Sequence, residues 1–535
     1  MFFDVLPMRW RVGVAVAAGC SLGMVLASGA NAGEPFSAWP QASGPHGDWT
    51  AETKNAPVEW SVAWNQNIAW KTTLPESGQS GIAVWGNRLF LTTLKPLDPH
   101  SQTRTGHDVV GYCLDANSGA ILWTADLPGT EESTYAYGFS DSSSPTPVTD
   151  GEHVWFWNAS GSMGCWDYSG KPVWMRIWKP TTGRPFNKQF EPLLVGDTLL
   201  NMEPRDEGDP KRENDPWNYL RGIDKRTGRT LWVSEDALTH YNTPGIGTFP
   251  DGTRVVLQGR GGHHGVPELP VGMSATSLTP GAEGRAVWRY EGTGRALYTM
   301  QTHAGRTFWW NESDQVEVLD SRTGKLLKTL FLSRNVDLRR FVPETGRHEL
   351  SADVDVAAVS PGQTVFPAWF TNIPCGGFLY FLCFSERKYG PAHCIGRVHI
   401  ETGKVEYLEV PVQVVRTPGE AESRIWGEPQ TSSTINARGI DVAGDQRSKR
   451  DGWHWCMLGN PTVFGGRVYF TTMLGITYVV DGSAPVLDEK ALLAVNDLGK
   501  AGTAWSLNTI SCAGDRLFHR SMREVVCIHN QRPSR

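Results

Sequence analysis

The sequence predicts an all-β fold built from repeated four-stranded units. Its 535 residues include 58 glycines, 34 prolines and 23 tryptophans, which suits many short strands and turns better than helices. A polar turn closed by glycine and followed four residues later by tryptophan also recurs, most clearly from Asp224 through Gly228 to Trp232. Strand-type repeats of about 40–50 residues are typical of a β-propeller.

Each part of the repeat has a physical reason. The glycine supplies the positive φ that a tight antiparallel turn needs, and the tryptophan offers a large apolar surface to a neighbouring sheet. The turn glycines are Gly119, Gly170, Gly228, Gly284, Gly324, Gly403 and Gly502. The residues that follow them in the tryptophan position are Trp123, Trp174, Trp232, Trp288, Lys328, Tyr407 and Trp505, while Trp70 matches the outgoing strand without its turn.

These eight outgoing strands predict eight blades. Seven is the alternative, because the units beyond residue 288 match the repeat poorly. The Trp70 strand stands before any complete unit, and the tail Leu507–Asn530 has room for about three strands. We therefore expect the two chain ends to share one sheet, which would close the ring and remove an exposed edge.

The turn Asp-x-x-Thr-Gly followed by x-x-x-Trp resembles the tryptophan motif of the pyrroloquinoline-quinone (PQQ)-type propellers. That family includes quinoprotein alcohol dehydrogenases and the non-enzymatic outer-membrane assembly lipoprotein BamB. The opening Ala38–Pro45 also resembles the lead-in of secreted members. The resemblance implies the propeller fold over nearly the whole mature chain, whereas one fold hosts many functions.

Residues 1–32 have the pattern of a secretory signal: a positive flank, an apolar core and a small-residue cleavage site, at Arg9 and Arg11, Val12–Gly29 and Ala30–Ala32. Lipid attachment at Cys20 is an alternative, which the apolar sequence beyond it disfavours. We predict an exported protein, periplasmic or extracellular, with no transmembrane segment after signal removal. Residues 33–535 would then form one propeller domain, expected to be a monomer. The net charge of −6 gives no basic footprint for nucleic acid.

Three cysteines occupy equivalent places near the end of a third strand: Cys113, Cys165 and Cys527. We expect them to be free thiols that pack in the core of each blade. Pairing among Cys375, Cys383, Cys394, Cys456 and Cys512 is left open. The absence of Cys-x-x-Cys-His argues against covalent haem.

Six insertions interrupt the repeat, at residues 94–110, 202–220, 259–274, 333–353, 371–393 and 415–455. Each follows a second strand or an outgoing strand. In a four-stranded blade both connections emerge on one rim, so we expect the insertions to gather on one face, where function concentrates.

The most unusual insertion joins glycines to Arg260, His263, His264 and Glu268. Glycines let backbone approach a ligand closely, and the imidazoles could bind metal or act as acid and base. Adjacent histidines in an extended chain point to opposite sides, however, so we expect no shared metal. Further ligand-facing candidates are Tyr298, His303 and Tyr137, for which burial against the next blade is the alternative.

We therefore predict a non-catalytic binding or assembly module with a protein or saccharide partner on the insertion-bearing face. The first alternative is a PQQ-dependent oxidoreductase acting on an alcohol or sugar, and the second is a metal-dependent enzyme using His263 and His264. The dehydrogenases of the family use calcium and an aspartate base, and many have two adjacent cysteines. This chain has no adjacent cysteine pair, and we align no calcium ligand with it. We expect no cofactor, with PQQ and calcium as the alternative.

Overall fold

The computed structural model describes residues 38–53, 55–135, 141–180, 190–211, 217–239, 243–261, 270–311, 314–356, 365, 367–383, 392–427, 431–444, 446–449 and 459–530. All of them belong to the compact unit Ser37–Arg535. Every structural statement below concerns these residues. The side chain of Arg447 is outside this description.

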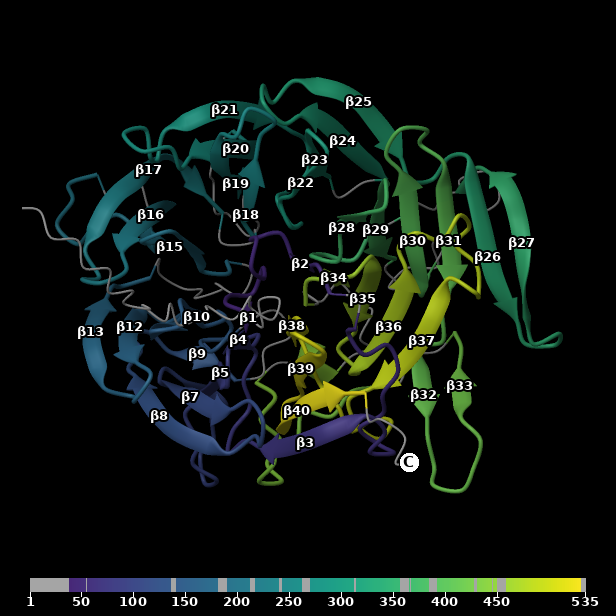
Figure 1. Ribbon diagram of the computed structural model, residues 1–535, viewed down its shortest axis with the longest axis horizontal. Helices are drawn as coiled ribbons and strands as arrows, with labels where there is room; N and C mark the ends of the chain where they lie inside the picture. The colour runs from purple at the N-terminus through teal and green to yellow at the C-terminus, as the bar shows by residue number, and fades with distance from the viewer. Residues whose placement is uncertain are drawn as a thin grey trace, which may run out of the picture. The chain divides into compact units, whose positions relative to one another are not determined.

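Eight antiparallel sheets form the blades of a propeller (Figure 1). From the innermost strand outward, blade 1 is β4 (Ala83–Trp85), β5 (Arg88–Leu94), β7 (Val109–Asp115) and β8 (Ile121–Leu127); blade 2 is β10 (Val148–Thr149), β11 (His153–Asn158), β12 (Ser162–Asp167) and β13 (Pro172–Ile177); blade 3 is β14 (Leu193–Val195), β15 (Thr198–Pro204), β16 (Asn218–Asp224) and β17 (Thr230–Leu238); blade 4 is β18 (Gly245–Thr248), β19 (Arg254–Arg260), β20 (Gly272–Ser277) and β21 (Ala286–Glu291).

Blade 5 is β22 (Thr302–His303), β23 (Arg306–Trp310), β24 (Gln315–Asp320) and β25 (Leu326–Phe331); blade 6 is β28 (Ile373–Cys375), β29 (Phe378–Leu382), β30 (Cys394–His399) and β31 (Val405–Glu409); blade 7 is β34 (Thr462–Phe464), β35 (Arg467–Thr471), β36 (Ile476–Asp481) and β37 (Leu492–Asp497); blade 8 is β38 (Ser511–Ala513), β39 (Arg516–Arg520), β40 (Glu524–His529) and β3 (Ile68–Thr73). The predicted eight-bladed fold is confirmed, and the seven-blade alternative is wrong.

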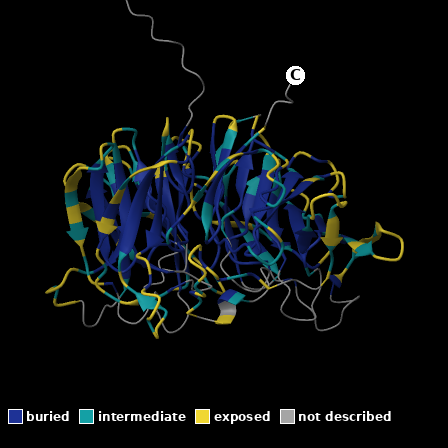
Figure 2. Cartoon of the chain, turned by 90° about the horizontal axis from the view of Figure 1, so that it is seen from below, coloured by how far each residue is buried: buried dark blue, intermediate teal, exposed yellow. Residues whose placement is uncertain are grey.

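Because successive strands are antiparallel, each blade has two kinds of connection on opposite sides. The turn rim carries the first-to-second and third-to-fourth turns. The loop rim carries the second-to-third loops and the linkers between blades. Figure 2 shows buried strands between two rims on which exposed residues concentrate.

The ring closes as the sequence predicts. Strand β3 pairs antiparallel with β40, with Trp70 opposite Cys527, and the sheet order is β3-β40-β39-β38. The first full-length strand of the chain is therefore the outermost strand of the last blade, so no blade is left with three strands.

Tryptophans dock each blade onto the next. Four indole N–H groups donate to a carbonyl in the third-to-fourth turn of the following blade: Trp70 to Ala116 at 3.1 Å, Trp123 to Tyr168 at 3.1 Å, Trp174 to Lys225 at 3.0 Å and Trp288 to Ser321 at 2.8 Å. The turn glycine lies against the same indole. At Gly119, with φ of +75°, a Cβ would sit 2.5 Å from Trp70 Cε3. Glycine is thus required for both its conformation and its size.

The three equivalent cysteines lie directly opposite these tryptophans across the sheet. Cys113 pairs with Trp123, Cys165 with Trp174 and Cys527 with Trp70. All three are buried free thiols, as predicted, and burial raises the pKa of each to about 12. Cys375, Cys383, Cys394 and Cys512 are also free, while Cys456 lies outside the described residues.

Two junctions have charged side chains in place of the docking tryptophan. Tyr407, which the repeat predicts in the tryptophan position of blade 6, instead packs against blade 5 and donates to Leu332 O at 2.7 Å. At the junction of blades 5 and 6, Lys328 Nζ donates to Glu401 O at 2.9 Å. At the junction of blades 6 and 7, the buried Arg397 forms an ion pair with Glu406 at 2.5 Å and donates to Ala484 O at 2.7 Å. Glu406 also accepts the backbone N–H of Leu487 at 2.9 Å. Buried polar groups are stable here because both partners are bonded.

Trp505 does not lie on an outgoing strand, so that part of the repeat alignment is wrong. The outgoing strand of blade 7 is β37, and an insertion between β36 and β37 displaces the turn from its usual spacing. Trp505 instead lies buried between β37 and β38 and donates to Ser448 O at 3.0 Å. The spacing between Gly502 and Trp505 is coincidental.

Two of the predicted insertions contain strands that belong to the sheet of blade 6. Residues 333–353 contain β26 (Val336–Val342) and most of β27 (Arg347–Val354), which extend the outer edge of blade 6, with β26 parallel to β31. Residues 371–393 contain β28 and β29, because the actual insertion begins only after Leu382. The hairpin β32 (Gln413–Val415) and β33 (Ser423–Ile425) follows blade 6, and η1 (Gln446–Lys449) comes later in the same linker.

Residues 38–53 lie against the innermost strands of several blades. Strand β1 (Ala38–Trp39) pairs with β4, and β2 (Thr50–Ala51) runs parallel to β34; both lie near the centre of Figure 1. Between them the segment bonds to blades 2, 3 and 4, through Pro40 O to Thr149 N, Gln41 Oε1 to Leu194 N and Gly47 O to Ile246 N. Trp39 and Trp49 are fully buried. The Thr53 hydroxyl also donates to Gly514 O of blade 8 at 3.0 Å. This segment therefore links six of the eight blades.

Gly119→Ala should destabilise the protein more than Gly403→Ala. The two glycines have nearly the same φ, +75° and +73°, but the nearest atom to a Cβ at Gly403 is 3.8 Å away. Both substitutions cost about 1–2 kcal/mol of left-handed strain, and Gly119→Ala adds about 1–3 kcal/mol of overpacking against Trp70. Urea unfolding of both variants measures the difference. Equal losses would contradict the role of the glycine–indole contact.

Candidate functional site

Polar side chains precede or begin the innermost strands in most blades. We call this set, which lies around the propeller axis, the inner collar: Gln79, Ser80, Ser143, Thr146, Glu191, Thr243, Thr299, Gln301, Asn372, Asn508 and Thr509, all buried. The repeat predicts apolar runs here and gives no signal for this set, except for Gln301, which we expect with Tyr298 and His303 at the start of an inner strand.

The inner collar joins neighbouring blades by hydrogen bonds. The side chain of Ser143 accepts from Gln79 N at 3.0 Å, and Glu191 accepts from Thr146 N at 2.8 Å. Asn372 Oδ1 accepts from Thr299 N at 3.0 Å, while the Thr299 hydroxyl donates to Asn460 at 2.6 Å. These polar groups therefore join adjacent blades and, through Thr299 and Asn460, also join blade 5 to blade 7.

Arg520 is an exception within this region. Its fully buried guanidinium donates through Nη1 to Thr92 O at 2.6 Å and to Ser80 Oγ at 3.3 Å, whereas Nε and Nη2 have no partner among the described residues. Burial lowers the pKa of Arg520 to about 10, against an opposing effect of Asp141. A Cβ at Gly78 would lie 2.9 Å from Nη2, so glycine makes room for this cation. Its remaining N–H groups can donate to an anion or a carbonyl.

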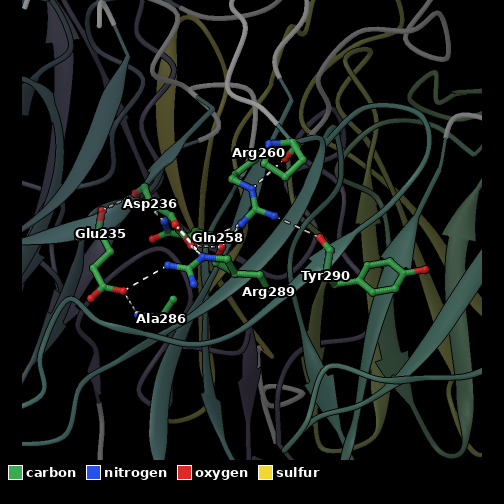
Figure 3. A network of polar contacts seen from close by, with 10 residues as sticks. Glu235, Asp236, Gln258, Arg260, Ala286, Arg289 and Tyr290 are labelled. Carbon is green, nitrogen blue, oxygen red and sulfur yellow. Dashed lines mark hydrogen bonds and ion pairs between the residues drawn. The ribbon is translucent and has the colours of Figure 1, made fainter.

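Arg260 lies inside blade 4, not on the surface where we expected it (Figure 3). Strand β19 extends through this residue and turns its side chain into the sheet, where it is 3% exposed. The guanidinium donates to Pro270 O at 2.9 Å, to Tyr290 O at 3.2 Å and to the Ser274 hydroxyl, and lies 3.5 Å from Asp236. Burial lowers the pKa of Arg260. Its role in the described structure is to hold β19 to β20 and β21.

The other predicted candidates have mixed positions. Tyr298 is buried and donates to Pro367 O at 3.2 Å, so its hydroxyl joins blade 5 to the segment before blade 6. His303 is half-buried on β22, and burial lowers its pKa. His263, His264, Glu268 and Tyr137 lie outside the described residues, so their predicted roles stay predictions.

A segment of the blade 6–7 linker extends across the loop rim to blade 1. We call residues 431–444 the strap. Within it, Arg438 forms an ion pair with the buried Glu76 at 2.7 Å and donates to Leu97 O at 2.8 Å, while Asn436 donates to Glu76 at 3.0 Å. Gly444 N donates to Tyr135 O at 3.0 Å. The partners are more than 300 residues apart, and no local pattern marks them.

Blade 1 contributes its own loop to the same place. Strands β6 (Thr105–Gly106) and β9 (Ser133–Thr134) form a small sheet that joins the second-to-third loop of blade 1 to its outgoing linker. Arg104 Nε donates to Asp441 O of the strap at 2.8 Å. The predicted insertions 94–110 and 415–455 thus meet on the loop rim.

A sequence comparison matches part of the chain to one family of propellers. The pattern that defines the family "Outer membrane protein assembly factor BamB" matches residues 58–235 and 106–269. The two matches together cover less than half of the chain; with the eight-bladed fold and the tryptophan docking they support a PQQ-like β-propeller. No sequence among the curated proteins matches it.

Several solved structures are similar in fold. A quinohemoprotein alcohol dehydrogenase, ADHIIG from Pseudomonas putida HK5, is 12% identical, with 91% of this chain and 81% of that chain covered and a TM-score of 0.48. A europium-containing methanol dehydrogenase is 14% identical, with 91% and 89% covered and a TM-score of 0.47. BamB from Moraxella catarrhalis is 14% identical, with 73% and 96% covered and a TM-score of 0.34. Such distant similarity says nothing about chemistry.

The described residues fit the quinone and its calcium unequally. Arg520 could pair with a carboxylate of the quinone. Calcium needs a set of oxygen ligands, and no group of three His, Cys, Asp or Glu side chains that could hold a metal occurs among the described residues. Among the described residues, the fit to the cofactor thus rests on Arg520. Within the same residues, no helix is long and apolar enough to span a bilayer.

Arg260→Ala should destabilise the protein by about 2–4 kcal/mol, because it leaves buried acceptors in blade 4 without their donor. Arg289→Ala is the matched control: Arg289 pairs with the same Asp236 at 2.9 Å, but its side chain is 49% exposed. Its loss should cost less than about 1 kcal/mol. Chemical denaturation measures both. If Arg260→Ala leaves the free energy of unfolding nearly unchanged, the buried contacts are not stabilising and Arg260 is again a candidate ligand-binding residue.

Because His519 is buried, the free energy of unfolding should decrease as the pH falls below 6.5. Burial lowers the pKa of this imidazole to about 3, so between these values the unfolded state binds a proton that the folded state does not. The stabilisation is complete above pH 6.5 and decreases toward pH 3. In His519→Gln, the unfolding free energy should fall less between pH 6.5 and pH 4.5 than in the parent protein. Parallel urea titrations test this, and equal falls would contradict it.

Proposed function

We propose that this protein is an exported, monomeric, non-catalytic binding or assembly module whose partner binds the loop rim. The observation that carries the proposal is the strap, which brings residues from the blade 6–7 linker onto blade 1. The buried Glu76 holds it through both Arg438 and Asn436. A rigid scaffold that positions loops from distant blades is suited to recognition of a large partner.

The family match supports an assembly role, since its description names an outer membrane protein assembly factor. The inner collar also supports a structural role for the residues around the propeller axis, because its polar groups join blades to one another. Export is supported by the predicted signal at residues 1–32. Mass spectrometry of the mature protein should then find Gly33 at the N-terminus.

A quinoprotein oxidoreductase is the second candidate, favoured by the unpartnered Nε and Nη2 of Arg520. A buried cation is stable when its donors are met by an acceptor, and a carboxylate-bearing quinone supplies one. Adding the quinone with calcium to the purified protein decides between the candidates. A bound quinone spectrum that is lost in Arg520→Met would favour the enzyme.

Photo-crosslinking in the native cells tests where the partner binds. A photoreactive amino acid at Gln102 or Lys211, both exposed on the loop rim, should crosslink one and the same partner. Asn117 and Arg226, exposed on the turn rim of the same two blades, are the matched controls and should give none. Crosslinks from the turn rim alone would overturn the proposal.

A further inference from the structure

A pocket of about 470 Å³ opens on the loop rim between blades 2 and 3. Its walls come from the end of β13 with the residues that follow and from the end of β15 with the loop that follows. Thr130 and Glu131, in the linker between blades 1 and 2, also line it. The pocket lies outside the strap and the inner collar and contains none of the predicted candidate residues. Its volume suits a small or extended polar ligand.

One wall is apolar and fixed in position. Trp178 is half-buried and packs against the core of blades 2 and 3. Its backbone is held on both sides, since Trp178 N donates to Gly161 O at 2.9 Å and its carbonyl accepts from Thr130 Oγ1 at 3.2 Å. Ile177, 59% exposed, continues the wall.

The polar part of the pocket is preorganised by a pair that spans it, with Arg176 on β13 beside the apolar wall and Glu203 on β15 opposite. Arg176 donates to both oxygens of Glu203, at 2.8 and 2.6 Å, and Asn201 donates to the same carboxylate at 2.8 Å. Glu203 is 1% exposed. Arg205 lies over the ring of Tyr219, with its Cζ 4.7 Å from the centroid. Arg176 and Glu203 are therefore held by each other before any ligand binds.

The charges of the lining residues favour one chemical class of ligand. Three cations, Arg176, Lys179 and Arg205, face four acids, Glu131, Glu203, Asp206 and Glu207. This balance disfavours phosphate and nucleic acid, which need net positive charge. An apolar ligand would strip water from paired charges and gain little. A neutral sugar satisfies both walls, because its C–H face packs on an indole and its hydroxyls both donate and accept hydrogen bonds.

We propose that this pocket binds a neutral saccharide, with Trp178 under the sugar ring and the Arg176–Glu203 pair beside the sugar hydroxyls. The inference rests on the proposed function, since it makes the pocket part of the loop-rim binding surface and names glycan as a partner class. It requires no chemical step.

Calorimetry with cellohexaose, maltohexaose and chitohexaose tests the proposal on the mature chain, with heparin as the anionic comparison. At least one neutral hexasaccharide should bind. Trp178→Ala should weaken that binding about tenfold, equivalent to about 1.4 kcal/mol, because it removes the aromatic contact. Trp178→Phe should retain most of the binding. Trp85→Ala removes a half-buried tryptophan from the turn rim and should leave binding unchanged.

Ile177→Asp is a second variant that keeps the proposal testable if Trp178→Ala does not fold. It places a charge on the exposed part of the apolar wall and should also weaken binding. Binding of heparin alone, binding of no hexasaccharide, or unchanged affinity in both Trp178→Ala and Ile177→Asp would overturn the saccharide site. Loop-rim crosslinks to a protein partner would then leave the proposed function standing. Turn-rim crosslinks with saccharide binding at Trp178 would overturn the proposed function and leave the site.

Discussion

The fold depends on one repeated contact, in which a tryptophan of one blade packs on the turn glycine of the next and donates its indole N–H to that turn. A blade alone is a small twisted sheet whose two faces both need covering. The indole covers apolar surface, while its N–H satisfies a carbonyl that the turn leaves open, as Trp70 does for Ala116 O. The contact fixes the spacing of neighbouring blades because Gly119 has no side chain to hold them apart.

The charged junctions show which half of this contact is essential. Lys328 keeps the hydrogen bond to the turn carbonyl and gives up the aromatic surface; at the matching turn, Gly403 is no longer crowded. Arg397 and Glu406 serve the next junction as a buried pair with additional bonds to Ala484 and Leu487. Removing one member of such a pair is strongly destabilising. The polar bond to the next blade is thus the feature these junctions retain, and the aromatic ring can be replaced.

This explains how far the sequence predicts the structure. The tryptophan and glycine are local signals with a fixed spacing, so the blades, the ring closure through Trp70 and the places of the cysteines follow from them. The spacing fails at Trp505, because an insertion in blade 7 moves the turn. Arg260 shows the other limit: its neighbours in sequence indicate a loop, yet β19 extends far enough to bury it. Glu76, Arg438 and Trp178 meet their partners through the fold, and no spacing in the sequence shows this.

The two rims have different constraints, and this separates stability from recognition. Turn-rim residues are fixed by docking, since a change at Ala116 or Gly119 acts directly on the neighbouring blade. Loop-rim segments lie beyond the repeated contacts and can lengthen without disturbing them, as the linker that contains the strap does. Two further features stabilise the scaffold. Strand β3 closes the ring in blade 8, and residues 38–53 link the innermost strands at the centre. Recognition can therefore change on the loop rim while the docking contacts are kept, which is why the binding surfaces inferred here, the strap and the Trp178 pocket, both lie there.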